Sequence, residues 1–146
     1  MSTEENKALM RRFYEEVYNQ KNLAAIDDYI APNFFNHSAS QLGITGGGDL
    51  EHVKLFVSMV MQVFPDLHYT VEDLIAEGDK VVARLTISGT QQGAFMGIPA
   101  TGKHVTVSNI EIFRITNGRG VETWVQVDFL GLLQQLGAIP TPGQAS

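Results

Sequence analysis

The sequence predicts an α+β fold, in which three N-terminal helices pack on a strongly curved antiparallel sheet that forms a cone with an internal pocket. Up to residue 64, apolar residues recur at steps of three and four, as in amphipathic helices. After residue 66, apolar and polar residues alternate, as in half-buried strands. No repeat or linker divides the 146 residues. We therefore expect one domain over 1–146, with an ordered core of about 3–138 and a Pro/Gly-rich tail at 139–146.

Three segments have a helical pattern. The first covers the first twenty residues and starts with Ser2 and Glu5 at the spacing of a capping box. The second covers Leu23–Ile30 and stops before Pro32, which cannot continue a helix. The third covers Leu50–Phe64, whose apolar residues form one continuous stripe.

Residue types that favour helix starts stand before three helical segments. Asn22 and Asp49 precede the second and third helices, and Asp128 precedes a closing helical turn at Gly131–Gly137. Each of the three is predicted to be an N-cap. Residues 33–48, rich in Gly, Ser and Asn, are predicted to be a loop.

Four strands are predicted at about 67–76, 80–91, 103–115 and 120–128. Two turns fit the last hairpin, and they place different residues beside Glu111. A two-residue turn at Asn117-Gly118 gives Trp124, Gln126 and Asp128 as its neighbours. A three-residue loop starting at Thr116 gives Thr123, Val125, Val127 and Phe129. The sequence leaves both registers open.

The third strand carries a carboxylate on an otherwise apolar face. Asn109 and Glu111 alternate with Val107 and Phe113. A covered, ionised carboxylate costs several kcal/mol unless it is paired, so burial raises its pKa toward neutrality. Such a group can act as a general acid or base. Alternatively, this face is exposed, or Glu111 pairs with a cation across the sheet.

A second candidate group follows the adjacent rings of Phe34 and Phe35. A loop that buries both rings would be pinned over the core, so Asn36 and His37 could reach over the mouth of a pocket. We expect Asn36 to be a hydrogen-bond donor there, and His37 to move or orient a proton.

Composition excludes several classes of function. The chain has no cysteine, which rules out thiolate nucleophiles, disulfides and iron–sulfur clusters. Its net charge of −6 argues against nucleic-acid binding. No histidine pair has metal-ligand spacing, so no dedicated metal site is expected. No apolar run could span a bilayer and no signal peptide is recognisable, so we expect a cytoplasmic protein.

Four stretches carry a resemblance to a known family: APNFFNH, ISGTQQGAFMGIPATGK, IEIFRITNGRGVETW and DFLGLLQQLG. With them, the chain from Asn6 to Gly137 resembles the SnoaL-like polyketide cyclases, or ester cyclases, of the nuclear transport factor two-like superfamily. The resemblance implies an α+β cone with a deep apolar pocket, assembled as a homodimer or higher homo-oligomer. It also implies intramolecular aldol ring closure without metal or cofactor.

The resemblance assigns roles by position. The polar pocket residues fall on Asn36, Asn109 and Glu111, and residues that face substrate fall on Tyr18 and Phe56. Phe35, Val107 and Val125 complete the predicted substrate-binding set. The catalytic aspartate of the characterised cyclases falls on Val125, and Gln91 stands where relatives often have histidine. Glu111 is therefore the acid expected to replace that aspartate.

Three functions follow. The first is a cyclase or isomerase that removes a proton alpha to a carbonyl of a small hydrophobic compound, with Glu111 as base, Asn109 and Asn36 as enolate donors and His37 as proton shuttle. The second is a module that binds such a ligand without transforming it. The third is hydrolysis through an Asp–Arg–Asp relay inside the pocket, for which Arg84 and Arg114 are the available arginines.

Overall fold

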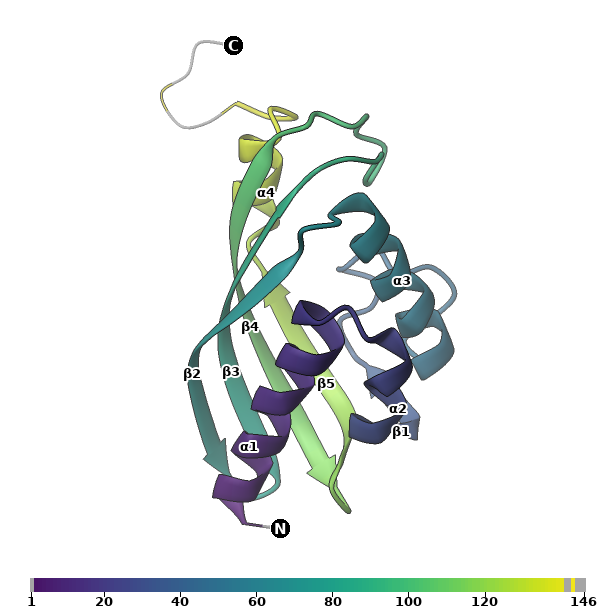
Figure 1. Ribbon diagram of the computed structural model, residues 1–146, viewed down its shortest axis with the longest axis vertical. Coiled ribbons are helices and arrows are strands. Elements are labelled where there is room, and N and C mark those ends of the chain that lie inside the picture. The colour runs from purple at the N-terminus through teal and green to yellow at the C-terminus, as the bar shows by residue number, and fades with distance from the viewer. Residues whose placement is uncertain (1, 141–142, 144–146) are drawn as a thin grey trace.

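A computed structural model describes residues 2–140 and 143 (Figure 1). The fold is α+β, with a five-stranded sheet and helices, as predicted. The predicted tail at 139–146 falls mostly outside the described residues. In chain order, the elements are α1 (Thr3–Phe13), a π-helix (Tyr14–Asn19), a 3-10 turn (Leu23–Ala25), α2 (Ile26–Tyr29), β1 (Ile30–Asn36), α3 (Leu50–Val63), β2 (His68–Glu77), β3 (Lys80–Thr90), β4 (His104–Thr116), β5 (Arg119–Val127) and α4 (Phe129–Gln135).

The sheet has the order β1-β5-β4-β3-β2. Neighbouring strands from β2 to β5 are antiparallel, whereas β1 runs parallel to β5. The sheet is therefore mixed, and the prediction of a purely antiparallel sheet is wrong. Strand β1 covers part of the predicted 33–48 loop and contains Pro32. Proline is tolerated there because β1 is an edge strand, where one side of the backbone needs no ladder partner.

The first predicted helix is divided. Ser2 and Glu5 form the predicted capping box at the start of α1, and their two reciprocal hydrogen bonds are each 3.1 Å. The backbone then changes at Tyr14 to a π-helix that runs to Asn19. A π-helical turn is rare, and it frequently accompanies a functional site. The side chains it carries toward the sheet are described below.

The predicted N-caps have different outcomes. Asp128 accepts a hydrogen bond from the Gly131 backbone nitrogen at 2.9 Å and caps α4, as expected. Asp49 stands at the N-cap position of α3, but its carboxylate contacts His52 instead of a backbone amide. Asn22 makes no capping bond either, because a 3-10 turn replaces the start of the predicted Leu23–Ile30 helix.

The β4–β5 hairpin combines features of both predicted registers. Its turn is the two-residue Asn117-Gly118 form, with both residues at positive φ and Thr116 paired with Arg119. One extra residue, Val121, then shifts the register between the pairs Ile115–Gly120 and Arg114–Glu122. Glu111 consequently stands opposite Val125 and shares a face with Thr123 and Val127, which is the face that the three-residue loop predicts. The bulge, not the turn, decides which side chains share the face of Glu111.

Helices α1 and α3 lie on the same side of the twisted sheet, and α4 closes its upper end in this view (Figure 1). The core between these layers is apolar and includes Met10, Phe13, Val17, Leu85 and Phe113. A second cluster lies under α4 and the 91–102 loop. Among the described residues, no helix has the length and apolar character that a bilayer crossing requires.

Candidate active site

A cavity of about 150 Å³ lies between the sheet and α3, with α4 near one end. Most of its lining is aliphatic or aromatic, and the polar groups that reach it are few. They come from the π-helix, the end of β1, the first residues of β2 and the middle of β4: Tyr18, Asn36, Tyr69, Asn109 and Glu111. An apolar pocket with a few convergent polar groups is the usual form of a small-molecule site.

Glu111 lies at the centre of the sheet, between Ala83 of β3 and Val125 of β5. Only 8% of its surface is exposed, so the alternative of an exposed face is wrong. Its one hydrogen bond of acceptable geometry comes from the Asn109 Nδ2, at a long 3.5 Å. Burial without a cation raises the pKa of Glu111 to about 7, even though the Tyr14 hydroxyl lowers it in part. Glu111 can therefore exchange a proton near neutral pH.

Three tyrosines lie near this carboxyl: Tyr14, Tyr18 and Tyr69. The ring centroids of Tyr18 and Tyr69 are 4.1 Å apart and stacked, and Tyr14 stacks on Tyr69 at 5.8 Å. Burial raises the pKa of all three phenols, and the nearby charge of Glu111 raises each of them further. The Tyr14 hydroxyl is fully buried; it lies close enough to lower the pKa of Glu111, although it falls short of a well-aligned hydrogen bond. All three phenols therefore stay protonated, and each can donate one hydrogen bond as well as accept one.

The π-helix and β2 are joined beside this cluster. The Asn19 Nδ2 donates to the Tyr69 carbonyl at 2.9 Å, and the Tyr69 backbone nitrogen donates to the Asn19 Oδ1 at 2.7 Å. Asn19, which directly follows Tyr18, thus joins the π-helix to the start of β2. This double hydrogen bond holds Tyr18 and Tyr69 face to face.

Asn36 reaches the cavity because β1 ends there. Its backbone nitrogen donates to the Gly48 carbonyl at 2.7 Å, and its Oδ1 accepts a hydrogen bond from the Ser38 backbone nitrogen at 2.8 Å. Ser38 in turn accepts from the Val125 backbone nitrogen, also at 2.8 Å. These bonds leave the Nδ2 group of Asn36 available to a ligand. The side chain is 5% exposed.

Replacing Gly48 with alanine is expected to destabilise the protein and displace Asn36. A Cβ at position 48 would lie 2.2 Å from the Asn36 carbonyl oxygen, a backbone atom that cannot move aside alone. We expect the free energy of unfolding to fall by about 1–3 kcal/mol, measured by chemical denaturation. Gly93→Ala is the matched control, because a Cβ there meets Val63 at an ordinary 3.7 Å. Equal stability of the two variants would contradict this prediction.

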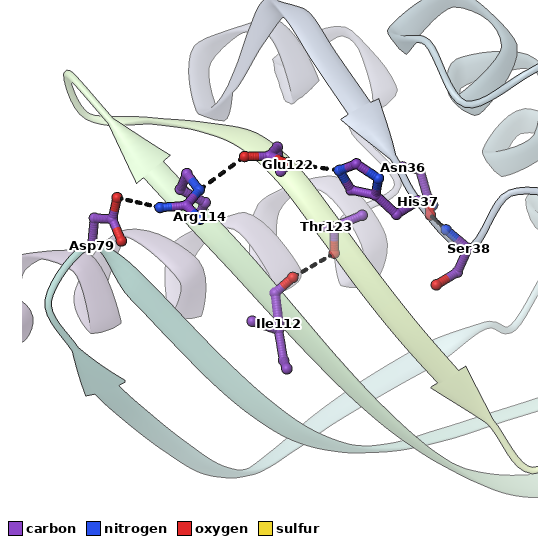
Figure 2. A network of polar contacts seen from close by, with 8 residues as sticks. All are labelled: Asn36, His37, Ser38, Asp79, Ile112, Arg114, Glu122 and Thr123. Atoms are coloured by element: carbon purple, nitrogen blue, oxygen red, sulfur yellow. Dashed lines mark hydrogen bonds and ion pairs between the residues drawn. The ribbon is translucent and has the colours of Figure 1, made fainter.

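His37 does not join the cavity. Asn36 pairs with Thr123 in the sheet, so the next side chain points to the opposite face. There the His37 Nε2 contacts the Glu122 carboxylate at 2.7 Å (Figure 2). The His37 ring also stacks on Trp124, with centroids 4.8 Å apart. The predicted placement of His37 over the pocket mouth is therefore wrong.

Phe35 is also outside the pocket. It is 46% exposed and packs edge-on against His37, whereas Phe34 is buried and packs near Phe113. The expectation that the chain buries both rings is correct only for Phe34. The reason is the same strand alternation, which the predicted loop conformation did not include. The other predicted substrate-binding residues line the cavity: Tyr18, Phe56, Val107 and Val125.

The arginines considered for a hydrolytic relay lie on the outer face. Arg114 bridges Asp79 and Glu122, at 2.8 Å to each, and Glu122 in turn contacts His37 (Figure 2). Arg84 pairs with Asp73 on the surface. An Asp–Arg–Asp relay inside the pocket therefore does not exist among the described residues. Within these same residues, no three His, Asp or Glu side chains gather as a metal ion would require.

Gln91 has a structural position. Its amide donates to the Gly93 and Ile98 carbonyls and accepts hydrogen bonds from Thr101. These contacts hold the 91–102 loop, from which Phe95 reaches the cavity. Both polar atoms of the Gln91 amide are used in these hydrogen bonds, and Gln91 does not line the cavity.

The sequence alone does not reveal the contribution of Tyr14 and Tyr69. Tyr14 belongs to the apolar stripe of the first helix, where a phenol is normally a core residue. Tyr69 lies on the inward-facing side of β2. Its spacing of two residues from Val71 is the sequence signal that indicates this orientation. Neither position shows from sequence alone that the hydroxyl approaches a carboxylate on β4.

Comparisons with known proteins identify the family of this chain. The family model described as SnoaL-like polyketide cyclase matches residues 8–136, so the chain belongs to the SnoaL-like polyketide cyclase family. It is 28% identical over 121 residues to nogalonic acid methyl ester cyclase of Streptomyces nogalater, covering 82% of this chain and 89% of that one.

Two further proteins are similar over nearly their whole length. Aklanonic acid methyl ester cyclase DnrD of Streptomyces peucetius is 27% identical over 135 residues, which cover 92% of each chain. The solved structure of TsrD from Streptomyces laurentii superposes with a TM-score of 0.84 at 32% identity, covering 95% of this chain and 99% of that one. The predicted family is therefore confirmed.

Proposed function

We propose that this protein is a cofactor-free cyclase that removes a proton alpha to a carbonyl of a small hydrophobic compound. The observation that carries the proposal is the buried carboxyl of Glu111, whose pKa of about 7 lets it accept and return a proton at neutral pH. Membership of a polyketide cyclase family supports the reaction class. A purely structural carboxyl at this depth would be expected to have a cation beside it.

The chemistry requires two proton transfers. The Glu111 carboxylate takes a proton from the carbon alpha to a carbonyl, and the electron pair of that C–H bond shifts to form an enolate. The enolate carbon attacks a second carbonyl of the same molecule and forms the ring bond. The new alkoxide then takes the proton from Glu111. Atoms and electrons balance, so substrate and product are isomers and no co-reactant is consumed.

The pocket amides have complementary parts in this proposal. Asn109 donates to Glu111 and orients its carboxyl, while the free Nδ2 of Asn36 can donate to a substrate oxygen. Val125 is the strand partner of Glu111. A carboxylate at either position would face the same part of the cavity. This supports Glu111 as the residue that takes the role of the aspartate on the last strand of related cyclases.

The relatives suggest a substrate class. Both curated relatives are named as cyclases of methyl esters of a carboxylic acid. We propose a methyl ester that carries a second carbonyl within reach of ring closure. The cavity of about 150 Å³ is close to the size that accommodates one benzene ring in a protein interior. An open-chain ester of about this size therefore fits the pocket as it stands.

Incubation of the wild-type protein with candidate keto methyl esters in D₂O tests the proposal. We expect deuterium to enter at the carbon alpha to the carbonyl, and a cyclic isomer of otherwise unchanged mass to form. Mass spectrometry and NMR measure both. A compound that binds tightly and returns without deuterium would support the alternative of a binding module. Exchange that requires an added metal ion would contradict cofactor-free catalysis.

A further inference from the structure

The tyrosines near Glu111 carry phenol hydroxyls that can donate hydrogen bonds beside the proposed base. Proton removal alpha to a carbonyl builds negative charge on the carbonyl oxygen, two bonds from the carbon that loses its proton to Glu111. A group that stabilises this oxygen must lie beside Glu111 and face the cavity. Donors aimed at developing charge in a dry site give large rate effects.

Tyr18 satisfies both conditions. It lines the cavity, and it is close enough to Glu111 for the charge of that carboxylate to act on its phenol. Tyr69 lies next to it with stacked rings and also lines the cavity. Tyr14 faces Glu111 from a fully buried position outside the cavity lining, so it can orient the base but cannot touch a substrate.

The surrounding chain fixes Tyr18 in place. It lies in the six-residue π-helix, and Asn19 joins that helix to the backbone of Tyr69 by two hydrogen bonds of 2.9 and 2.7 Å. Lys21, at positive φ, donates from Nζ to the Tyr18 carbonyl at 3.2 Å and also to the Leu67 carbonyl. A donor held by so many contacts needs little reorganisation when charge appears beside it.

We propose that Tyr18 is a catalytic residue, whose phenol donates a hydrogen bond to the enolate oxygen while Tyr69 and Asn19 hold it in position. This inference rests on the proposed function, and it adds a stronger donor than the amide of Asn36. A phenol is closer in acidity to an enol than an amide is, so the shared proton gives a stronger hydrogen bond. The phenol keeps its proton throughout; only the hydrogen bond strengthens.

Binding of para-nitrophenol tests the inference without a known substrate, because its ionised form places a negative oxygen on a single ring, as an enolate does. The measurement is made at about pH 6, where Glu111 is mostly protonated. Absorbance reports the ionised form of the bound probe, and toluene serves as a neutral probe of cavity shape. The decisive quantity is the ratio of the two affinities.

For Tyr18→Phe, we expect this ratio to fall by about tenfold to a hundredfold, the usual effect of a hydrogen bond to a charged group. Tyr29→Phe is the matched control, because the Tyr29 hydroxyl contacts Glu16 instead of the cavity. Its ratio should equal that of the wild type. A fall of this affinity ratio by less than about tenfold in Tyr18→Phe overturns the inference. An equal loss of affinity for both probes leaves the ratio unchanged and has the same meaning. A wild-type protein that binds no ionised probe also overturns it.

A Glu111 variant separates this inference from the proposed function. Glu111→Gln keeps a donor beside the cavity and removes a competing charge, so the bound nitrophenolate should be retained or strengthened. If turnover survives in Glu111→Gln, the proposed base is wrong even when Tyr18→Phe behaves as expected. If turnover is lost but Tyr18→Phe leaves the affinity ratio unchanged, the base stands and the donor role of Tyr18 fails.

Discussion

Glu111→Gln is expected to lower kcat/KM for ring closure by about a hundredfold to ten-thousandfold. Glutamine keeps the volume and the contact with Asn109 but cannot accept the proton. In the wild-type protein, the pH profile of kcat/KM should rise to a plateau with an apparent pKa near the value of about 7 that burial gives Glu111. Steady-state rates of product formation between about pH 5 and pH 9 measure both effects.

Glu122→Gln is the matched control for this experiment. Glu122 lies on the neighbouring strand, but its carboxylate faces outward and pairs with His37 and Arg114. We expect its kcat/KM to stay within about threefold of the wild type, since no contact joins it to the cavity. Loss of activity in this variant equal to that of Glu111→Gln would show that the outer network, not the pocket carboxyl, limits the reaction.

The same substitution at Glu111 should make the protein more stable in alkaline solution. The folded-state pKa of Glu111 is raised from 4.5 to about 7, so the folded state binds a proton that the unfolded state has released. Burial of Glu111 therefore costs no stability below about pH 4.5, where the carboxyl is protonated in both states. As the pH rises through about 7, burial lowers the free energy of unfolding. The full cost above this window is about 3 kcal/mol. Glu111→Gln removes it.

Urea denaturation at about pH 4.5 and about pH 8 measures this difference. The gain in stability of Glu111→Gln over the wild type should grow by about 3 kcal/mol between the two pH values. Glu122 gives the opposite sign, because contacts with His37 and Arg114 lower the pKa of its carboxyl and stabilise its ionised form. A Glu111 variant less stable than the wild type at about pH 8 would mean that the carboxylate is held by favourable contacts.

Long periodic segments made most of the fold predictable. The stripe over Leu50–Phe64 and the alternation through Glu111 each correspond to an observed element, because packing against the core demands those periods. The π-helix at Tyr14–Asn19 was not predictable, since its residues also suit an α-helix. Strand β1 was missed because Pro32 and the polar residues after it resemble a loop.

The candidate site was predictable where alternation along one strand was enough. Asn109 and Glu111 share a face in any register, so their common orientation followed from the sequence. His37 and Phe35 were misplaced because their orientation depends on how β1 pairs with β5. The approach of Tyr14 and Tyr69 to Glu111 depends on packing between a helix and two strands, which no local pattern encodes.

The bulge at Val121 bears on how proteins of this shape diversify. If Val121 were instead paired within the ladder, Trp124 and Gln126 would turn inward and Val125 would leave the side of the carboxyl. A shift of one residue in strand pairing near a hairpin tip can thus exchange the whole set of groups presented to a ligand, with no change to the residues themselves. In such lineages, a change of register is as direct a source of new chemistry as a point substitution.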